Sequence, residues 1–223
     1  MGNIARLNID AIRSCLKDTQ GNFKHINASL TVKRTAPSDE VIENLVAGYK
    51  KIDSYLKNGT KLFEIGSSEC LLELNQIVLY QHADISKEEQ AYQFEATKAH
   101  FYKAKHGGIG QLMEWLEFHK NSNVWMQTAG IFTHILSQPQ LFLEGNHRTG
   151  SLIMSYLLAK SGHCPFVLSY ENAKHFFEPA ELIKKRRKKT LDEFLYLPKQ
   201  TRKFAKLLKS EQKDRRYLIK NLV

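Results

Sequence analysis

The sequence predicts an all-α protein with one small hairpin, from two kinds of observation. Apolar residues recur at helical spacing in successive segments of the chain. Capping residues, glycines or prolines stand where those segments begin or end. Hydrophobic residues make up 42% of the chain, which is ordinary for a globular protein with its own core. No apolar run approaches the ~18 residues of a membrane-spanning helix, so we expect no transmembrane segment.

Local signals place the individual helices. Ser38 precedes Asp39 and Glu40, which is the pattern of a capped helix N-terminus. Gly162 follows an apolar helix at the position where a left-handed residue often ends one. A short strand is expected at Thr31–Lys33. The expected helices cover about residues 39–58, 69–80, 86–104, 111–119, 124–136, 147–161 and 172–189 (interrupted near Pro179), then a last stretch from 191 that Pro198 divides.

The basic residues are concentrated near the C-terminus. The whole chain has 33 Lys and Arg against 23 Asp and Glu. Residues 184–223 hold 15 of the basic and 4 of the acidic side chains, a local net charge of +11, while the remainder is nearly neutral. Such a basic face can bind nucleic acid, an anionic membrane surface or an acidic partner. The run Lys184–Lys189 is the candidate for an anionic partner or nucleic acid, and a solvated helix face is the alternative.

Cysteine usage and the N-terminus suggest a compartment. Cys15, Cys70 and Cys164 are scattered, with neither metal-ligand spacing nor a disulfide framework. We expect small buried thiols in a reducing environment. The first residues contain no apolar stretch typical of a signal peptide. A cytoplasmic location is therefore expected, and secretion as an effector into a host cell remains open.

The segment Gln140–Gly150 is the candidate site, because a tight loop here enters an apolar helix. Gly145 permits unusual backbone dihedrals, and the free amides of the following helical turn favour an anion. Arg148 could contact a phosphate with two donors, Asn146 could donate to another oxygen, and Glu144 could hold Mg²⁺. The alternative is an ordinary helix start, in which the asparagine caps the helix and the two charges are solvated.

The same segment resembles the signature of the Fic family, written HPFx[DE]GN[GK]RxxR. The positions that match at the family's spacing are Phe142, Glu144, Gly145, Asn146 and Arg148. Residues 101–108 resemble the family's hairpin flap, and the likeness covers roughly residues 69–168. It implies a Fic-type helical bundle with a small β-hairpin flap over 69–168, an N-terminal helical extension over 1–68, and a basic C-terminal helical segment over 169–223.

The resemblance also implies a chemistry. Most Fic proteins transfer AMP from ATP to a hydroxyl side chain of a target protein, using magnesium. By this likeness ATP or another nucleotide would lie on Gly145, Asn146, His147, Arg148 and Gly150, with Mg²⁺ on Glu144. A target protein would dock at the flap, His106–Gly110.

The departures from the family pattern concern the reaction itself. Gln140 stands at the family's catalytic histidine, the general base, and a glutamine accepts no proton near neutral pH. Leu141 replaces the proline, His147 the second glycine and Ser151 the last arginine. His147 is a candidate substitute base, because an imidazole can titrate near neutrality.

The sequence therefore predicts a Fic-like protein that binds a nucleotide phosphate and whose transferase activity is altered or lost. Two alternatives remain open. One is a non-catalytic regulatory or binding module, and the other is nucleic-acid binding through the basic C-terminal segment.

Overall fold

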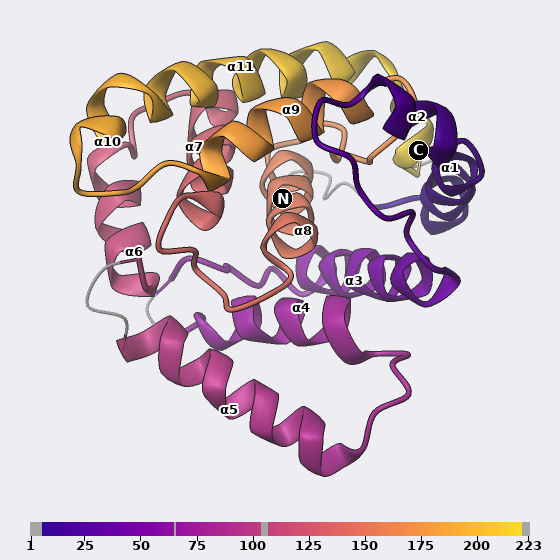
Figure 1. Cartoon of the computed structure of the whole chain (residues 1–223), viewed down its shortest axis with the longest axis horizontal. Coiled ribbons are helices and arrows are strands. Elements are labelled where there is room, and N and C mark those ends of the chain that lie inside the picture. The colour runs from indigo at the N-terminus through magenta and orange to yellow at the C-terminus, as the bar shows by residue number, and fades with distance from the viewer. Residues whose placement is uncertain (1–5, 65, 104–106, 220–223) are drawn as a thin grey trace.

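The computed structural model describes residues 6–64, 66–103 and 107–219. Within these ranges the chain forms helices joined by loops, with two isolated β-bridges and no β-strand (Figure 1). The all-α prediction is confirmed for this part of the chain. The β-hairpin flap is not confirmed, because Phe101–Lys103 are helical and the next helix begins at Ile109. Residues 104–106, where the flap was also expected, lie outside the described ranges.

The helical bounds agree with the predicted ones to within a few residues over most of the chain. They are α1 (Ile9–Gly21), α2 (Phe23–Ser29), α3 (Asp39–Lys57), α4 (Glu69–Tyr80), α5 (Lys87–Lys103), α6 (Ile109–Phe118), α7 (Val124–Leu136), α8 (Asn146–Lys160), α9 (Ala173–Lys184), α10 (Leu191–Leu195) and α11 (Leu197–Ser210), followed by the short 3₁₀ turns Glu211–Lys213 and Arg215–Tyr217. No helix of the described ranges has the length and apolar character needed to cross a bilayer.

The strand predicted at Thr31–Lys33 is wrong. This segment is irregular, and its flanking amides bond to side chains and not to a neighbouring strand. The Thr31 amide donates to Glu178 (2.6 Å), and the Arg34 amide donates to Asn27 (2.8 Å). β-propensity alone does not make a strand where no ladder partner is available.

Helix α8 is the centre of the fold. It packs against α7, α3 and α4, which surround it in Figure 1. Every residue of α8 before Lys160 is buried or half-buried. Its apolar side chains Leu152, Ile153 and Met154 are fully enclosed. The surrounding core therefore fixes the position of the α8 N-terminus, where the Gln140–Gly150 segment enters.

The basic run Lys184–Lys189 is not a continuous helix face. α9 ends at Lys184, and the following residues cross the loop after α7. The Gln138 amide donates to the Arg186 carbonyl (2.7 Å), and the Lys188 amide donates to the Gln138 carbonyl (2.8 Å). The Lys188 side chain is only 6% exposed, and its Nζ donates to the carbonyl of His134 in the last turn of α7 (2.7 Å). A cation suits this position, since the C-terminal carbonyls of a helix carry partial negative charge.

The burial of Lys188 predicts a pH dependence of stability. Burial lowers the pKa of its ammonium to about 7, and Glu193 partly opposes this shift. An unfolded lysine keeps its proton up to about pH 10.4. Between pH 7 and 10 the unfolded state therefore binds more protons, so this group makes the free energy of unfolding rise with pH.

Lys188→Met should lower that slope by up to about 1 kcal/mol per pH unit. Urea unfolding of both proteins between pH 7 and 9 would measure it. The exposed neighbour Lys189 provides the control, since Lys189→Met should keep the wild-type slope. Equal slopes for wild type and Lys188→Met would contradict a titrating buried ammonium.

Candidate functional site

Asn146, the first residue of α8, holds the preceding loop in place. Asn146 is 4% exposed, and its Oδ1 accepts from the Phe142 amide (2.9 Å) while its Nδ2 donates to the Phe142 carbonyl (2.7 Å). Phe142 itself is buried and stacks on Phe101 of α5 with ring centroids 5.6 Å apart. The Leu141 amide donates to the carbonyl of Ile135 (3.1 Å). Asn146 thus uses its side-chain amide to bond the loop backbone, and these bonds fix the shape of the loop.

Gly145 makes the turn into α8 and requires glycine. Its φ is +73°, in the left-handed region that side chains with a Cβ rarely adopt. A Cβ added here would lie 2.9 Å from Nδ2 of Asn75 and 3.3 Å from Leu79. Asn75, on α4, donates to the Glu144 carbonyl (2.9 Å) and to Thr149 Oγ1 (3.0 Å). The turn is therefore locked onto α4, and the first amides of α8 have no intrahelical acceptor.

Gly150 has a different role from the other motif glycine. It is buried where α8 crosses α7, and a Cβ here would lie 2.7 Å from the ring of Phe132. The structure therefore places this predicted nucleotide-binding residue in a helix–helix contact and not in the loop.

Arg148 is half-buried beside the loop. Its Nη1 donates to the carbonyl of Val78, near the C-terminal end of α4 (2.7 Å). Burial lowers its pKa, and the charge of Glu144 opposes this shift. Arg148 also lines a cavity, and Nη1 anchors its guanidinium to α4.

His147 is neutral in the folded protein. Burial, followed by the charges of Arg34, Lys184 and Arg148, lowers its pKa to about 3. Its Nε2 is enclosed and has no hydrogen-bond partner among the described residues. An imidazole with such a pKa is a weak proton acceptor at neutral pH, so this environment does not favour the role of substitute base.

Gln140 is built into the loop. Its Nε2 donates to the carbonyl of Leu136 at the end of α7 (3.1 Å), and its Oε1 accepts from Asn146 at 3.4 Å. Its backbone carbonyl lies 2.8 Å from Nε2 of His100 on α5. The side chain of Gln140 therefore caps the C-terminal end of α7.

Glu144 projects from the turn with an exposed side chain. No set of three His, Cys, Asp or Glu side chains within residues 6–64, 66–103 and 107–219 gathers around a point that could hold a metal ion. A single carboxylate is nevertheless compatible with Mg²⁺, because this ion commonly uses one or two carboxylates together with substrate phosphates and water. The charge of Glu144 acts to raise the pKa of Arg148.

A cavity of about 660 Å³ opens beside the first turns of α8. His147, Arg148 and Ser151 form its α8 side. The other walls come from α1, α2, α3, α9, the segment 34–38 and Leu168. They are mostly apolar and include Leu16, Phe23, Val41, Leu45, Phe176 and Phe177. Arg34 stands at this wall, with its guanidinium 4.6 Å from the centre of the Phe177 ring and an ion pair to Glu181 (3.0 Å). The cavity is large enough for a small organic ligand.

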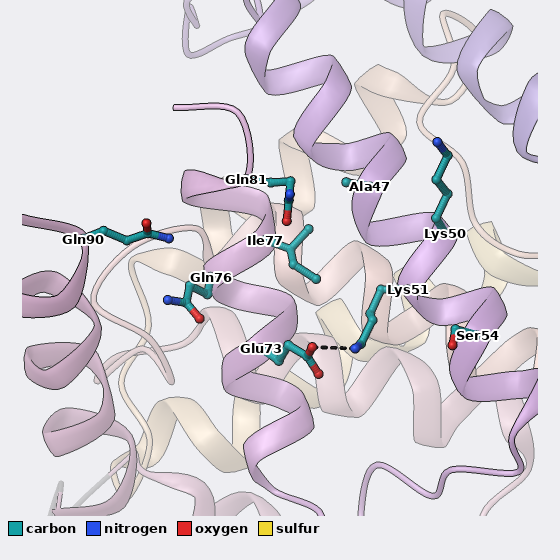
Figure 2. A pocket seen from close by; sticks show the side chains of 9 residues that line it. All are labelled: Ala47, Lys50, Lys51, Ser54, Glu73, Gln76, Ile77, Gln81 and Gln90. Carbon is teal, nitrogen blue, oxygen red and sulfur yellow. Dashed lines mark ion pairs between the residues drawn. The ribbon is translucent and has the colours of Figure 1, made fainter. Parts of the chain in front are cut away.

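A second hollow of about 550 Å³ lies between α3 and α4 (Figure 2). Lys51 and Glu73 face each other across it and form an ion pair (2.5 Å). Its lining contains no residue of the Gln140–Gly150 segment. It is therefore separate from the candidate site.

Three residues that the sequence did not indicate take part in the site. Asn75 fixes the turn, His100 contacts the loop backbone, and Arg34 stands beside His147 at the cavity. Each lies 40 or more residues from its partner in the chain. No local pattern signals such contacts, because they depend on how the helices pack.

Comparison with known proteins gives little that bears on this site. No family model matches the chain, and no curated protein matches it. A solved structure of a Fic domain containing signaling protein from Bacteroides thetaiotaomicron is 13% identical. The match covers 93% of the present chain and 98% of that protein, with a TM-score of 0.44. A similarity this loose says nothing about the chemistry of the present chain.

Proposed function

We propose that this chain binds the phosphates of a nucleotide, ATP with Mg²⁺, at the loop Glu144–Arg148. In this proposal it is a Fic-like protein whose transferase activity is altered or lost. The observation that carries the proposal is the turn at Gly145, where the free amides of α8 begin directly after Glu144 and next to Arg148 in the chain, and where the charge of Glu144 acts to raise the pKa of Arg148. The cavity that His147 and Arg148 line provides room for a ligand next to Arg148.

The phosphates would be held mainly by backbone and by Arg148. The N-terminal amides of a buried helix attract an anion through hydrogen bonds and through the helix dipole. Arg148 adds a full charge that its bond to Val78 holds in position. The side chain of Asn146 is already bonded to Phe142, so its contribution is to keep the loop in shape.

The cavity supports the remaining part of the ligand. Its apolar walls suit the flat face of a nucleobase. Arg34, which lies over the ring of Phe177, adds a second cation beside the first turns of α8. Mg²⁺ bound to Glu144 would supply charge neutralisation for the phosphates. The residues present therefore fit a nucleotide with its metal ion.

The same geometry supports the loss of ordinary AMP transfer. Gln140 cannot accept a proton, and its side chain is occupied in capping α7. His147 has a pKa of about 3 and is a poor base. Both observations favour a regulatory or binding role for the nucleotide site over transfer by the usual route.

Arg148→Ala should weaken binding of ATP by about 1.5–3 kcal/mol, which is the contribution of a charged hydrogen bond. This corresponds to roughly 10- to 150-fold in the dissociation constant. Isothermal titration with ATP and Mg²⁺ would measure it. Arg202→Ala is the matched control, because Arg202 is an exposed arginine on α11 and should leave the affinity unchanged. Equal affinities for Arg148→Ala and wild type would rule out the proposed phosphate site.

Deletion of residues 184–223 is not a suitable test of nucleic-acid binding through this segment. Phe204 and Leu208 of α11 are fully buried, and α11 packs on α7. Removal of this segment would open the core. Point substitutions on the exposed face of α11 are therefore the appropriate variants.

A further inference from the structure

Helix α10 displays a cluster of apolar side chains to solvent. Four large apolar residues within six positions are between 45% and 77% exposed: Leu191, Phe194, Leu195 and Tyr196. No residue of α10 is buried. Single exposed apolar side chains are common on protein surfaces, but a contiguous group marks an interaction site.

The acidic residues of α10 do not interrupt this cluster. Asp192 pairs with Arg186 (3.3 Å), and Glu193 accepts from the Lys189 amide (2.7 Å). Both acids are half-buried toward the preceding loop. The side of α10 that carries Phe194 and Leu195 is therefore left without an exposed acid of its own helix.

The exposed position of α10 is fixed by the structure around it. The guanidinium of Arg186 lies 4.0 Å from the centre of the Tyr196 ring. The preceding loop is bonded to Gln138, and Lys188 is anchored in the core through the His134 carbonyl. These contacts hold the loop before α10 in place, and with it the exposed apolar cluster.

Helix α11 follows α10 directly in the chain, packs against it and carries positive charge. Its charged side chains are all basic and all exposed: Lys199, Arg202, Lys203, Lys206 and Lys209. Their spacing places them along one side of the helix, while Phe204 and Leu208 on the other side are buried. Figure 1 shows α11 along the upper edge of the molecule, with α10 at its N-terminal end.

We propose that α10 and the basic face of α11 together dock on the surface of an anionic phospholipid bilayer. The apolar side chains of α10 would enter the interface between headgroups and acyl chains, and the lysines and arginine would contact acidic headgroups. An apolar group beside a row of cations is the arrangement that interfacial membrane binding uses.

The combination of the two parts favours a bilayer over a nucleic acid. Cations alone would serve phosphates of either kind. Leucine side chains have neither a hydrogen-bonding group nor an aromatic face for a nucleotide, so Leu191 and Leu195 would gain nothing from DNA or RNA. Acyl chains accept apolar side chains, and the free energy gained scales with the apolar area buried.

The test is cosedimentation of the full chain with two kinds of vesicle. One is phosphatidylcholine alone, and the other contains about 30 mol% phosphatidylserine, within the range of an anionic leaflet. The protein should bind the phosphatidylserine vesicles at least about tenfold more strongly, and added salt should weaken this binding.

Two double variants separate the apolar and the basic contributions. Phe194→Ser with Leu195→Ser, and Lys203→Glu with Lys206→Glu, should each lower the partition onto anionic vesicles by at least about tenfold. Matched controls come from α5, at the opposite edge in Figure 1. Tyr92 is 76% exposed there, and Lys87 and Lys103 are exposed as well. Tyr92→Ser, and Lys87→Glu with Lys103→Glu, should bind like wild type.

Thermal unfolding and circular dichroism of each variant would verify that it is folded; the substituted side chains are all exposed. Absence of binding to either vesicle, or equal losses in the α5 controls, would overturn the proposal. The proposal would also be overturned if the chain bound duplex DNA more tightly than the vesicles and if Phe194→Ser with Leu195→Ser left that DNA binding unchanged. Failure here would leave the nucleotide proposal intact, because no variant touches the α8 loop.

Discussion

Gln140→His is expected to raise transfer of AMP from ATP, to the protein itself or to a partner, by about 10²–10⁴ in rate. The substitution places a proton acceptor at the position that the proposed Fic-like function assigns to the general base. Gln140 now donates to the Leu136 carbonyl through Nε2. An imidazole there could donate one nitrogen to that carbonyl and keep the other free to take a proton from a hydroxyl.

Intact-mass measurement after incubation with ATP and Mg²⁺ would detect the AMP adduct. Gln140→Asn is the control, because it retains an amide at this position without supplying a base. We expect an adduct in Gln140→His alone. If Gln140→His binds ATP but gives no adduct in the presence of candidate target proteins, the chain is not an AMP transferase lacking only its base.

Asn146→Ala is expected to destabilise the protein by about 2–4 kcal/mol. The substitution removes both bonds to Phe142 and leaves a buried amide and a buried carbonyl without their partner. An unsatisfied buried polar group costs roughly 1–3 kcal/mol. The effect should appear in the free energy of unfolding and also in nucleotide affinity, since the loop carries the proposed phosphate site.

Urea unfolding of wild type and Asn146→Ala gives the comparison. Asn121 is exposed in the turn between α6 and α7, so Asn121→Ala should change the stability by no more than about 0.5 kcal/mol. A similarly small change in Asn146→Ala would mean that the loop is not held by this side chain.

Most helices could be predicted because their signals are local. Ser38 and Asn123 accept hydrogen bonds from Val41 and Met126, as capping residues do, and the helices after them begin where the caps indicate. The interruption predicted near Pro179 did not occur. α9 continues through it, with Ala180 and Ile183 buried beyond the proline. Here packing outweighs the local cost of proline.

The candidate site could be predicted only in part. The motif indicated the turn at Gly145, whose positive φ the structure shows. The bond from Arg148 to Val78 and the burial of His147 beside Arg34 were not predictable, because the partners are distant in sequence. The role of Asn146 was open between helix cap and phosphate donor, and its bonds to the Phe142 backbone fit neither interpretation.

The basic C-terminal segment could also be predicted only in part. Its net charge was evident from the sequence, but the sequence did not show that Lys188 is buried while the charges of α11 are exposed. A run of like charges does not reveal which of them meets a helix C-terminus. That information depends on the approach of residues 185–189 to α7.

The most direct test of the central claim is thermal unfolding of the wild-type protein with increasing ATP and Mg²⁺. At about 100 times the dissociation constant, bound ligand should add ~2.7 kcal/mol of stability. For a chain of this size that is a rise of about 5–10 °C in Tm. We expect this rise, and we expect Arg148→Ala to abolish it. No change in Tm with any nucleotide would contradict a nucleotide site at Glu144–Arg148.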